Sequence, residues 1–300
     1  MKALSLFLFL SILTLGTKAQ DIEEIISKYT SENGKEFLLP LADCMGADFN
    51  SGLFHSASIK KMGFQLYIGI VTSAAFVPDK RRTFTAVPEG FFEPKTPVEV
   101  PTIFGPSENV VVNGNGGTQY VFPGGLNLKY LPLAVPQLTV GSVFGTDLTT
   151  RLLFTDTNED IGRIKLLGFG LRHSISQYLP DLPVDLAAGV YWQQFTIGDI
   201  ISAANWLGNV QTSYRASIFT FYGALGYEKS VLDLDYTFTG TDGDTHVKFD
   251  LAGSNNIRFT AGLTFNLGPV KLNADYNFAS QSVLSVGLGL GIGENAEKKL

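Results

Sequence analysis

Residues 257–292 read IRFTAGLTFNLGPVKLNADYNFASQSVLSVGLGLGI. In the segments 257–267, 270–278 and 284–292 every second residue is apolar, and the residues between are mainly polar or glycine. Alternation over about 9–11 residues is the pattern of a strand that crosses an outer membrane, because one face touches lipid and the other lines a lumen. The stretch therefore predicts an antiparallel transmembrane β-barrel.

The N-terminus has the features of a secretory signal peptide. Lys2 supplies a positive start, Ala3–Leu15 is an apolar run, and small residues precede a cleavage point after Ala19. No other segment approaches about 18 uninterrupted apolar residues, so no spanning helix is expected. An exported chain that lodges in a bilayer without such a helix does so as a closed barrel, which leaves no backbone unpaired in lipid.

Charge and cysteine content narrow the class further. The chain carries a formal net charge of −6, and loss of Lys2 and Lys18 with the signal peptide takes it to −8. This charge disfavours nucleic acid as a partner and suggests acidic loops that face water. The lone Cys44 cannot form an internal disulfide. The mature chain suits one monomeric barrel in the outer membrane of a Gram-negative envelope, with membrane lipid as its partner.

The region before the barrel predicts a helix followed by a stretch of small residues. Apolar residues recur at helical spacing over Asp21–Phe37, and Pro40 is expected to limit the helix. Leu41–Ser58, rich in Ala, Gly and Ser, then leads into the first strand. The segment either plugs the lumen or lies at the periplasmic rim. The expected division is a signal peptide over 1–19, an N-terminal helical segment over 20–58, a β-barrel over 59–293 and a polar tail over 294–300.

Ten strands are predicted, and their limits place short turns at one end of the barrel and long loops at the other. This asymmetry is usual for outer-membrane barrels, and an even strand number puts both termini in the periplasm. The interval Ser73–Gly117 is long enough to hold a further hairpin between Arg82–Val87 and Asn109–Val112, so ten to fourteen strands are expected. The ten predicted strands are 62–72, 118–130, 138–154, 161–173, 185–197, 213–227, 230–239, 256–267, 270–279 and 282–292.

If the apolar faces touch lipid, several charges near the C-terminus fall on the inner wall. Charges in a lumen must pair or stay hydrated. They form either an ion network that braces the wall or a pathway for a ligand or permeant molecule. Gly287, Gly289 and Gly291 leave the last strand bare on this side, which makes room for the N-terminal segment. The predicted lumen-lining charges are Asp233, Asp235, Arg258, Lys271 and Asp275.

Signals for catalysis are weak, and no catalytic residue, metal or cofactor is expected. His246 lies near Asp242 and Asp244, a spacing that could bind a divalent cation or form a hydrolytic pair, but a solvated acidic loop is favoured. Asp156–Asp160 begins like a calcium loop, yet Ile161 replaces the required glycine. The sequence therefore predicts a protein that is not an enzyme.

One stretch of the chain resembles a known family. It contains PLAD at 40–43, Gly46, NSG at 50–52, HSA at 55–57 and then Gly63-Phe64, and it resembles a family of outer-membrane barrel proteins of unknown function. The order of helical segment and barrel is similar, more loosely, to the long-chain fatty-acid transporters, whose resemblance implies an N-terminal hatch and a hydrophobic ligand pocket. None of their binding residues maps onto this chain. A polar tail also replaces the terminal aromatic residue that usually ends such barrels.

The expected function is binding or passage of a small molecule, hydrophobic ones included. A barrel this narrow either fills with side chains or holds one small ligand, so a wide diffusion pore is not expected. The alternative is a structural or adhesive envelope barrel that acts through its outer loops, with Pro-rich Val87–Pro106 as the working surface. A barrel hydrolase and a soluble secreted β-protein are less favoured.

Overall fold

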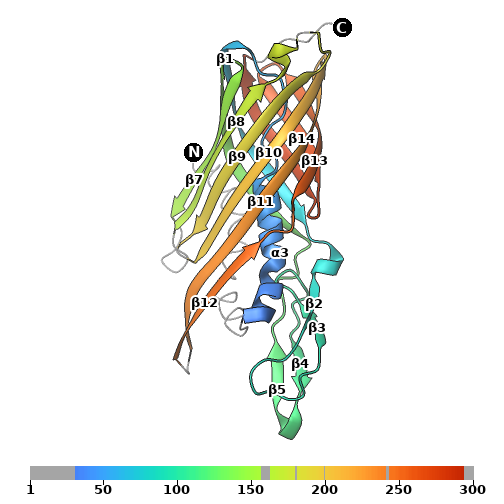
Figure 1. Ribbon diagram of the computed structural model, residues 1–300, viewed down its shortest axis with the longest axis vertical. Coiled ribbons are helices and arrows are strands. Elements are labelled where there is room, and N and C mark those ends of the chain that lie inside the picture. Colours follow the sequence, from blue (N-terminus) through green and yellow to red (C-terminus); the bar gives the residue numbers. More distant parts are fainter. Residues whose placement is uncertain (1–30, 157–162, 180, 199, 241–242, 294–300) are drawn as a thin grey trace.

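The computed structural model describes residues 31–156, 163–179, 181–198, 200–240 and 243–293, so the expected signal peptide lies outside the described residues. Within them, ten antiparallel strands form a closed barrel (Figure 1). Around the barrel the order is β10, β9, β8, β7, β6, β1, β15, β14, β13 and β11, and pairing of β11 with β10 closes it. The strands are β1 (Met62–Phe76), β6 (Tyr130–Val143), β7 (Thr146–Asp156), β8 (Arg163–Ser174), β9 (Asp185–Ile197), β10 (Ile201–Ala216), β11 (Phe219–Gly240), β13 (Ile257–Leu267), β14 (Val270–Phe278) and β15 (Val283–Ile292).

The two ends of the barrel differ. Short turns at 144–145, 217–218 and 268–269 join strands at one end, the short-turn end, where β15 also finishes. The opposite, long-loop end carries the segment 77–129 and an extension of β11, which continues past the barrel and pairs there with β12 (Gly243–Ala252) (Figure 1). The predicted asymmetry is therefore present only in part, because the ten-residue connection 175–184 lies at the short-turn end and the short connection 279–282 lies at the long-loop end.

The barrel wall is apolar outside and polar inside. Polar residues such as Gln137, Gln193 and Asn273 are buried on the inner face. The outward face forms a continuous apolar surface, which we call the apolar belt, as expected for strands in contact with lipid. Its exposed residues include Ile68, Leu138, Leu148, Leu152, Phe169, Leu171, Val190, Trp192, Trp206, Val210, Phe221, Leu225, Phe259, Leu263, Leu272, Leu284, Leu288 and Leu290.

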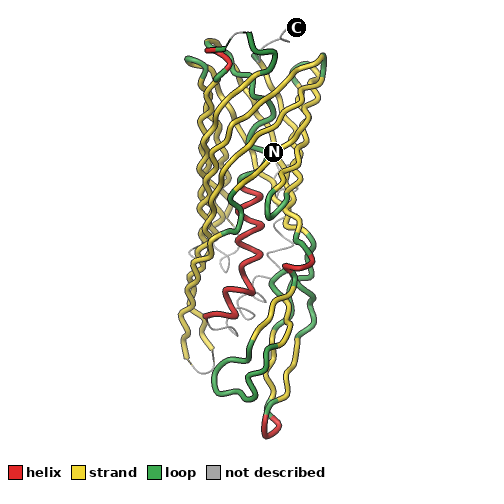
Figure 2. The backbone as a smooth tube through the Cα atoms, turned by 45° about the vertical axis from the view of Figure 1, so that its right-hand side comes forward, coloured by secondary structure: helices red, strands yellow, loops and turns green. Residues whose placement is uncertain are grey.

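One helix, α3 (Ser31–Phe49), occupies the mouth at the long-loop end (Figure 2). From its end the chain runs up through the lumen as Asn50–Lys61, the threading segment, and emerges at the short-turn end to begin β1. We call α3 and the threading segment together the plug. Among the described residues no helix is long and apolar enough to cross a bilayer.

Beyond the barrel, α3 is the centre of a second, apolar core. Its side chains Phe37, Leu38 and Phe49 are buried against Leu232 and Leu234 of β11, among others. We call this region the collar: β11 from Val231, β12, and the hairpins β2–β3 (Thr83–Ala86, Val98–Pro101) and β4–β5 (Val110–Asn113, Gln119–Phe122). On its far side the same core includes Val100, Ile103, Phe104, Phe122 and Leu131.

The helix differs from the predicted Asp21–Phe37. It continues through Pro40 to Phe49, so the expected limit at Pro40 is wrong, and residues 21–30 lie outside the described residues. Proline removes one backbone hydrogen bond, but burial of the flanking Leu38 and Ala42 in the collar core outweighs that loss. The expectation that both termini lie in the periplasm concerns residues 1–30 and 294–300, which lie outside the described residues.

The predicted strand 138–154 is a hairpin of β6 and β7. The turn residues Phe144 and Gly145 both have positive φ, 49° and 71°, as tight hairpin turns require. Leu138 pairs with Thr150 and Val140 with Leu148, so even positions face even positions across the turn. The apolar phase therefore passes through the turn unbroken, which is why the sequence reads as one long strand.

Four further predicted segments are wrong. The predicted strand 213–227 contains the β10–β11 turn, and the predicted turn at Glu228–Lys229 lies inside β11, where Glu228 is buried. The predicted strand 118–130 is only β5, which pairs with β4 outside the barrel. The turn expected at Leu131–Pro136 belongs to β6, because its prolines precede the part of β6 that pairs with β7.

The additional hairpin considered between Arg82–Val87 and Asn109–Val112 does not form. Both segments contain strands, but β2 pairs with β3 and β4 with β5. The barrel therefore has ten strands, at the low end of the predicted range.

Candidate functional site: the plug and its polar seat

Two arginines from different walls hold the C-terminal end of α3. Arg151 of β7 donates from Nη1 to the Phe49 carbonyl at 2.9 Å and from Nη2 to the Ser51 carbonyl at 2.8 Å. Arg258 of β13 donates from Nη2 to the Ala47 carbonyl at 2.8 Å and from Nη1 to the Ser51 hydroxyl at 2.5 Å. The last carbonyls of a helix lack intrahelical partners and carry partial negative charge, so two guanidinium groups stabilise this end.

Arg258 is also part of a buried ion pair. Its Nη2 lies 2.9 Å from a carboxylate oxygen of Glu228 on β11, and both side chains are at most 2% exposed. Removing either partner would leave an uncompensated charge in the lumen, which costs about 3–5 kcal/mol. The pair therefore fixes the Arg258 guanidinium at the helix end.

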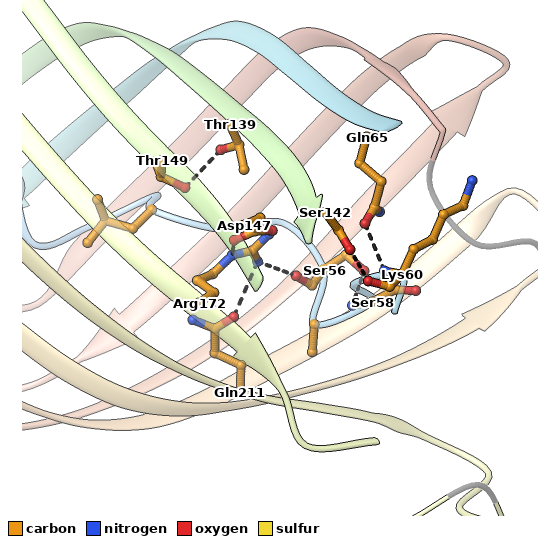
Figure 3. Close-up of polar contacts among 12 residues, drawn as sticks. Ser56, Ser58, Lys60, Gln65, Thr139, Ser142, Asp147, Thr149, Arg172 and Gln211 are labelled. Atoms are coloured by element: carbon orange, nitrogen blue, oxygen red, sulfur yellow. Dashed lines mark hydrogen bonds and ion pairs between the residues drawn. The ribbon is translucent and has the colours of Figure 1, made fainter. Parts of the chain in front are cut away.

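A third arginine holds the threading segment nearer the short-turn end (Figure 3). Arg172 of β8 makes two bonds to Asp147 of β7, at 2.9 Å to Oδ1 and 2.5 Å to Oδ2. Its Nη1 donates to the Ser56 carbonyl at 2.6 Å and to Oε1 of Gln211 at 3.3 Å. The bidentate pair orients the guanidinium, which leaves one edge for the backbone of the plug.

Uncharged side chains satisfy further carbonyls of the threading segment. Gln137 donates to the Leu53 carbonyl at 3.3 Å and Thr264 to the His55 carbonyl at 2.7 Å. Ser142 donates to the Lys60 carbonyl (Figure 3). We call these groups and the three arginines the polar seat. The side chains of the polar seat come from β6, β7, β8 and β13, and they bind backbone oxygens of the plug. The seat therefore fixes the path of the chain through the lumen.

Glycines on β1 and β15 make room for an aromatic side chain as well as for the plug. A Cβ on Gly289 would lie 2.6 Å from the Tyr67 ring, and one on Gly69 would lie 2.7 Å from the Tyr67 hydroxyl. The Tyr67 ring contacts the His55 ring, with 4.3 Å between centroids. Gly52 of the threading segment, with φ of 62°, approaches Val71 of β1. The space expected beside the glycines is thus filled by Tyr67 of β1 and by the plug.

Several buried polar atoms at the plug–wall contact have no hydrogen-bond partner. Both carboxyl oxygens of Asp48 on α3 belong to this group. So do the amide oxygen of Asn50 on the plug and both amide atoms of Asn205 on the wall. Unpartnered buried polar groups are costly and rare, so this contact is the least satisfied part of the lumen.

Three of the five predicted lumen charges lie in the lumen. Arg258 belongs to the polar seat. Lys271 is 3% exposed and donates to Oδ1 of Asn266 at 2.7 Å. Asp275 is 3% exposed and accepts from the Tyr222 hydroxyl at 3.0 Å.

The remaining two predicted charges lie elsewhere. Asp233 and Asp235 are on the outward face of the collar, where Asp235 pairs with His246 at 2.8 Å and both side chains are exposed. On this part of β11 the inward positions are Leu232 and Leu234, which pack on α3. The placement differs because on this part of β11 the inward face packs on the apolar helix α3, and the outward face carries the exposed Asp235.

The sequence reasoning missed the residues that matter most to the plug. Arg151, Arg172, Asp147 and Glu228 were not among the predicted lumen charges. The alternation contained the signal for two of them, because Arg151 lies out of phase with Leu148 and Leu152, and Arg172 follows Leu171 in the same way. Glu228 was assigned to a turn, which concealed its partnership with Arg258.

Two of the histidines are bonded to neighbouring side chains. His173 is bonded to Thr146 at 2.8 Å and to Tyr178 at 3.0 Å, and His246 pairs with Asp235 on the surface. Among the described residues no group of three or more His, Cys, Asp or Glu side chains could hold a metal ion. Asp242 and most of the calcium-like stretch 156–160 lie outside the described residues.

Comparison with known proteins assigns the chain to a family. A model for a family of unknown function, DUF6588, matches residues 1–292. The chain belongs to this family. That agrees with the family resemblance expected from residues 40–64. No curated protein sequence matches the chain significantly.

Solved structures similar to the chain are outer-membrane barrels. A loop-deletion mutant of OmpT, an outer membrane protein of Vibrio cholerae, is 10% identical, with coverage of 77% of this chain and 100% of that one and a TM-score of 0.29. A FadL homologue of Pseudomonas aeruginosa is 8% identical, with coverage of 83% and 96% and a TM-score of 0.25. Ail of Yersinia pestis, solved with a heparin analogue, is 12% identical, with coverage of 77% and 98% and a TM-score of 0.23. Likeness at this level carries no argument about function.

Proposed function

We propose that the protein is an outer-membrane barrel sealed by its own N-terminal segment, which anchors the collar for binding a partner outside the cell. The observation that carries this proposal is the double role of α3, which fills the mouth of the barrel and also forms the centre of the collar core. The apolar belt supports a position of the barrel in lipid. The collar then stands on the side of the long loops, which in outer-membrane barrels is the extracellular side.

The energetics favour a static plug over a moving one. Withdrawal of α3 would expose Phe37, Leu38 and Phe49, which are at most 2% exposed. Each such side chain contributes about 1.5–3 kcal/mol on burial. Withdrawal would also break the bonds from Arg151, Arg172 and Arg258 to backbone carbonyls. A conducting state reached this way would be rarely populated.

Passage of a small molecule is the second candidate. Its supporting observation is that polar contacts, which water can replace, hold the threading segment, and that buried polar atoms at the plug–wall contact lack partners. A solute that supplied those partners could stabilise a displaced threading segment without moving α3. This candidate requires the threading segment to leave the wall.

A disulfide across the plug–wall contact separates the two candidates. The hydroxyl oxygens of Ser56 and Ser213 lie 3.4 Å apart, so Ser56→Cys with Ser213→Cys should oxidise to a bond between plug and β10. Cys44→Ala in the background removes the native thiol. Conductance of the purified full chain is then recorded in planar bilayers, oxidised and reduced, with Ser213→Cys alone as control.

A sealed barrel gives no conductance steps in either redox state. Steps that appear in the reduced protein and vanish on oxidation would overturn the sealed barrel and favour passage. Failure of the disulfide to form would contradict the placement of the threading segment itself.

Two matched insertions test the side of the membrane on which the collar stands. Gly90, in the collar, and Gly268, in the β13–β14 turn, both have positive φ and open space around the Cβ direction. An epitope tag at Gly90 should be labelled on intact cells, and one at Gly268 only after the outer membrane is permeabilised. The reverse pattern would rule out a partner outside the cell.

A further inference from the structure

Asp48 stands out among the buried charged groups of the plug. It is 1% exposed, lies in the last turn of α3, and neither of its carboxyl oxygens accepts a hydrogen bond of normal geometry. The other lumen carboxylates have partners, since Asp147 is paired with Arg172, Glu228 with Arg258, and Asp275 accepts from Tyr222. A buried carboxylate without a partner is costly, so the neutral acid is the favoured form here.

The surroundings of Asp48 suit a neutral carboxyl group. Ser73 and the amide of Ala75 on β1 face it. Ser73 pairs in register with Ser285 of β15, whose side chain is 0% exposed and lies beside Asp275. Hydroxyl groups can donate to or accept from a protonated acid, whereas they compensate only part of a full charge.

We propose that Asp48 is a protonatable catch, which holds the end of α3 against β1 as a neutral acid and loosens it when it ionises. The carbonyls on either side of it, Ala47 and Phe49, are those bound by Arg258 and Arg151. A charge that appears at Asp48 draws in water or a cation at the place where the polar seat holds the helix. The inference extends the proposed function, because it makes the seal depend on pH.

The charged groups that face Asp48 act in opposite directions. Burial raises the pKa of Asp48 to about 8, and Ser73, the Ala75 amide and Arg258 lower it by smaller amounts. Within α3, the charges of Asp48 and Asp43 both raise the pKa of the buried Cys44 thiol. Asp43 is itself paired with Arg81 at 3.6 Å and accepts from the amide of Ser254 at 2.7 Å.

The sign of the effect follows from proton linkage. When α3 is loosened, Asp48 is solvated and titrates near its ordinary value, about 4. Between about pH 4 and pH 8 the seated helix therefore holds one more proton than the loosened one. Loosening becomes more favourable as the pH rises through this window, by up to about tenfold per pH unit, and changes little outside it.

The native Cys44 reports the loosening without a probe. It is buried in α3 one turn before Asp48 and is the only cysteine of the chain. Its reaction with a maleimide is measured on the full chain in detergent between pH 5 and pH 9, for the wild type and for Asp48→Asn, an uncharged isostere. The ratio of the two rates removes the ordinary titration of the thiol. Glu36→Gln, on the exposed face of α3, is the matched control.

The ratio of the maleimide reaction rate of the wild type to that of Asp48→Asn is expected to rise steeply with pH and to level off near pH 8. The rate of Glu36→Gln should follow that of the wild type. The Asp48 charge by itself raises the pKa of the Cys44 thiol, so direct electrostatics would move the ratio the opposite way. Asp48→Ala, which also lacks an ionisable group, replaces Asp48→Asn if that variant does not fold. A flat ratio would overturn the catch and would leave the sealed barrel, judged by conductance, untouched.

Discussion

The barrel and the collar are built on the same strand with opposite polarity. In β11 the barrel part turns Thr220 and Tyr222 inward and Phe221 and Leu225 outward. Past Glu228 the same alternation turns leucines inward and aspartates outward. The even positions of β11 turn inward in both parts, but their surroundings differ between the barrel and the collar. Alternation reports which residues share a face, and the solvent decides which face is the core.

The largest effect is expected from a charge placed in the collar interior. Leu234→Asp puts a carboxylate against α3, at a position that is 2% exposed. An unpaired buried charge should cost more than about 3 kcal/mol and unfold the collar. Limited proteolysis in detergent measures this directly, and the gel shift on boiling shows whether the barrel persists.

The matched substitution Asp235→Asn changes the outward face one residue away and should leave the collar resistant to protease. Equal sensitivity of both variants would break the assignment of inside and outside in the collar.

The next largest effect should come from a charge on the apolar belt. Leu225→Arg places a cation on the outward face of β11, where Leu225 is 61% exposed. An arginine in lipid costs about 2–4 kcal/mol near the midplane and less towards the interface. Val231→Arg, on the same face of the same strand but in the collar, should cost little. Denaturant titration in liposomes compares the two, and equal losses would place Val231 in lipid as well.

The smallest effect should come from the exposed ion pair of the collar. His246→Ala removes the contact with Asp235, in which both side chains are about half exposed. Pairs of this kind contribute at most about 1 kcal/mol because water and salt screen them. Thermal unfolding of the collar should therefore shift by only a few degrees. A large loss would mean that this surface is covered in the native protein.

The same contrast explains how far the sequence could be interpreted. The strands near the C-terminus, β13 to β15, were predicted within a residue or two, because Gly268 and Pro269 mark the turn between β13 and β14 and the faces of all three strands alternate without interruption. Predicted boundaries were wrong where the alternation continues through a turn, as at Phe144 and Gly145. They were also wrong in β6, where the prolines lie on a part of the strand that pairs with β1 but not with β7. Asp233 and Asp235 were misplaced because the rule that the apolar face turns outward to lipid was applied to the collar, where the apolar face turns inward to α3.

The plug seat could be predicted only in part. The alternation placed Arg258 inside and could have placed Arg151 there, since both lie out of phase with apolar neighbours. Their targets could not be read from the sequence, because they are backbone carbonyls of Ala47, Phe49 and Ser51, and backbone atoms leave no trace in residue identity. The helix end was hidden in the same way, because packing against β11 and β12 carries α3 through Pro40.

The path of the threading segment also constrains the order of assembly. β1 begins only after the chain has run the length of the lumen, and it pairs with β15, the last strand to be synthesised. The seam therefore closes around a chain that is already inside, and docking of the plug and closure of the ring become one kinetic event. Contacts so distant in sequence form slowly. Weakening of the seat should accordingly slow the folding of the barrel more than it lowers its final stability.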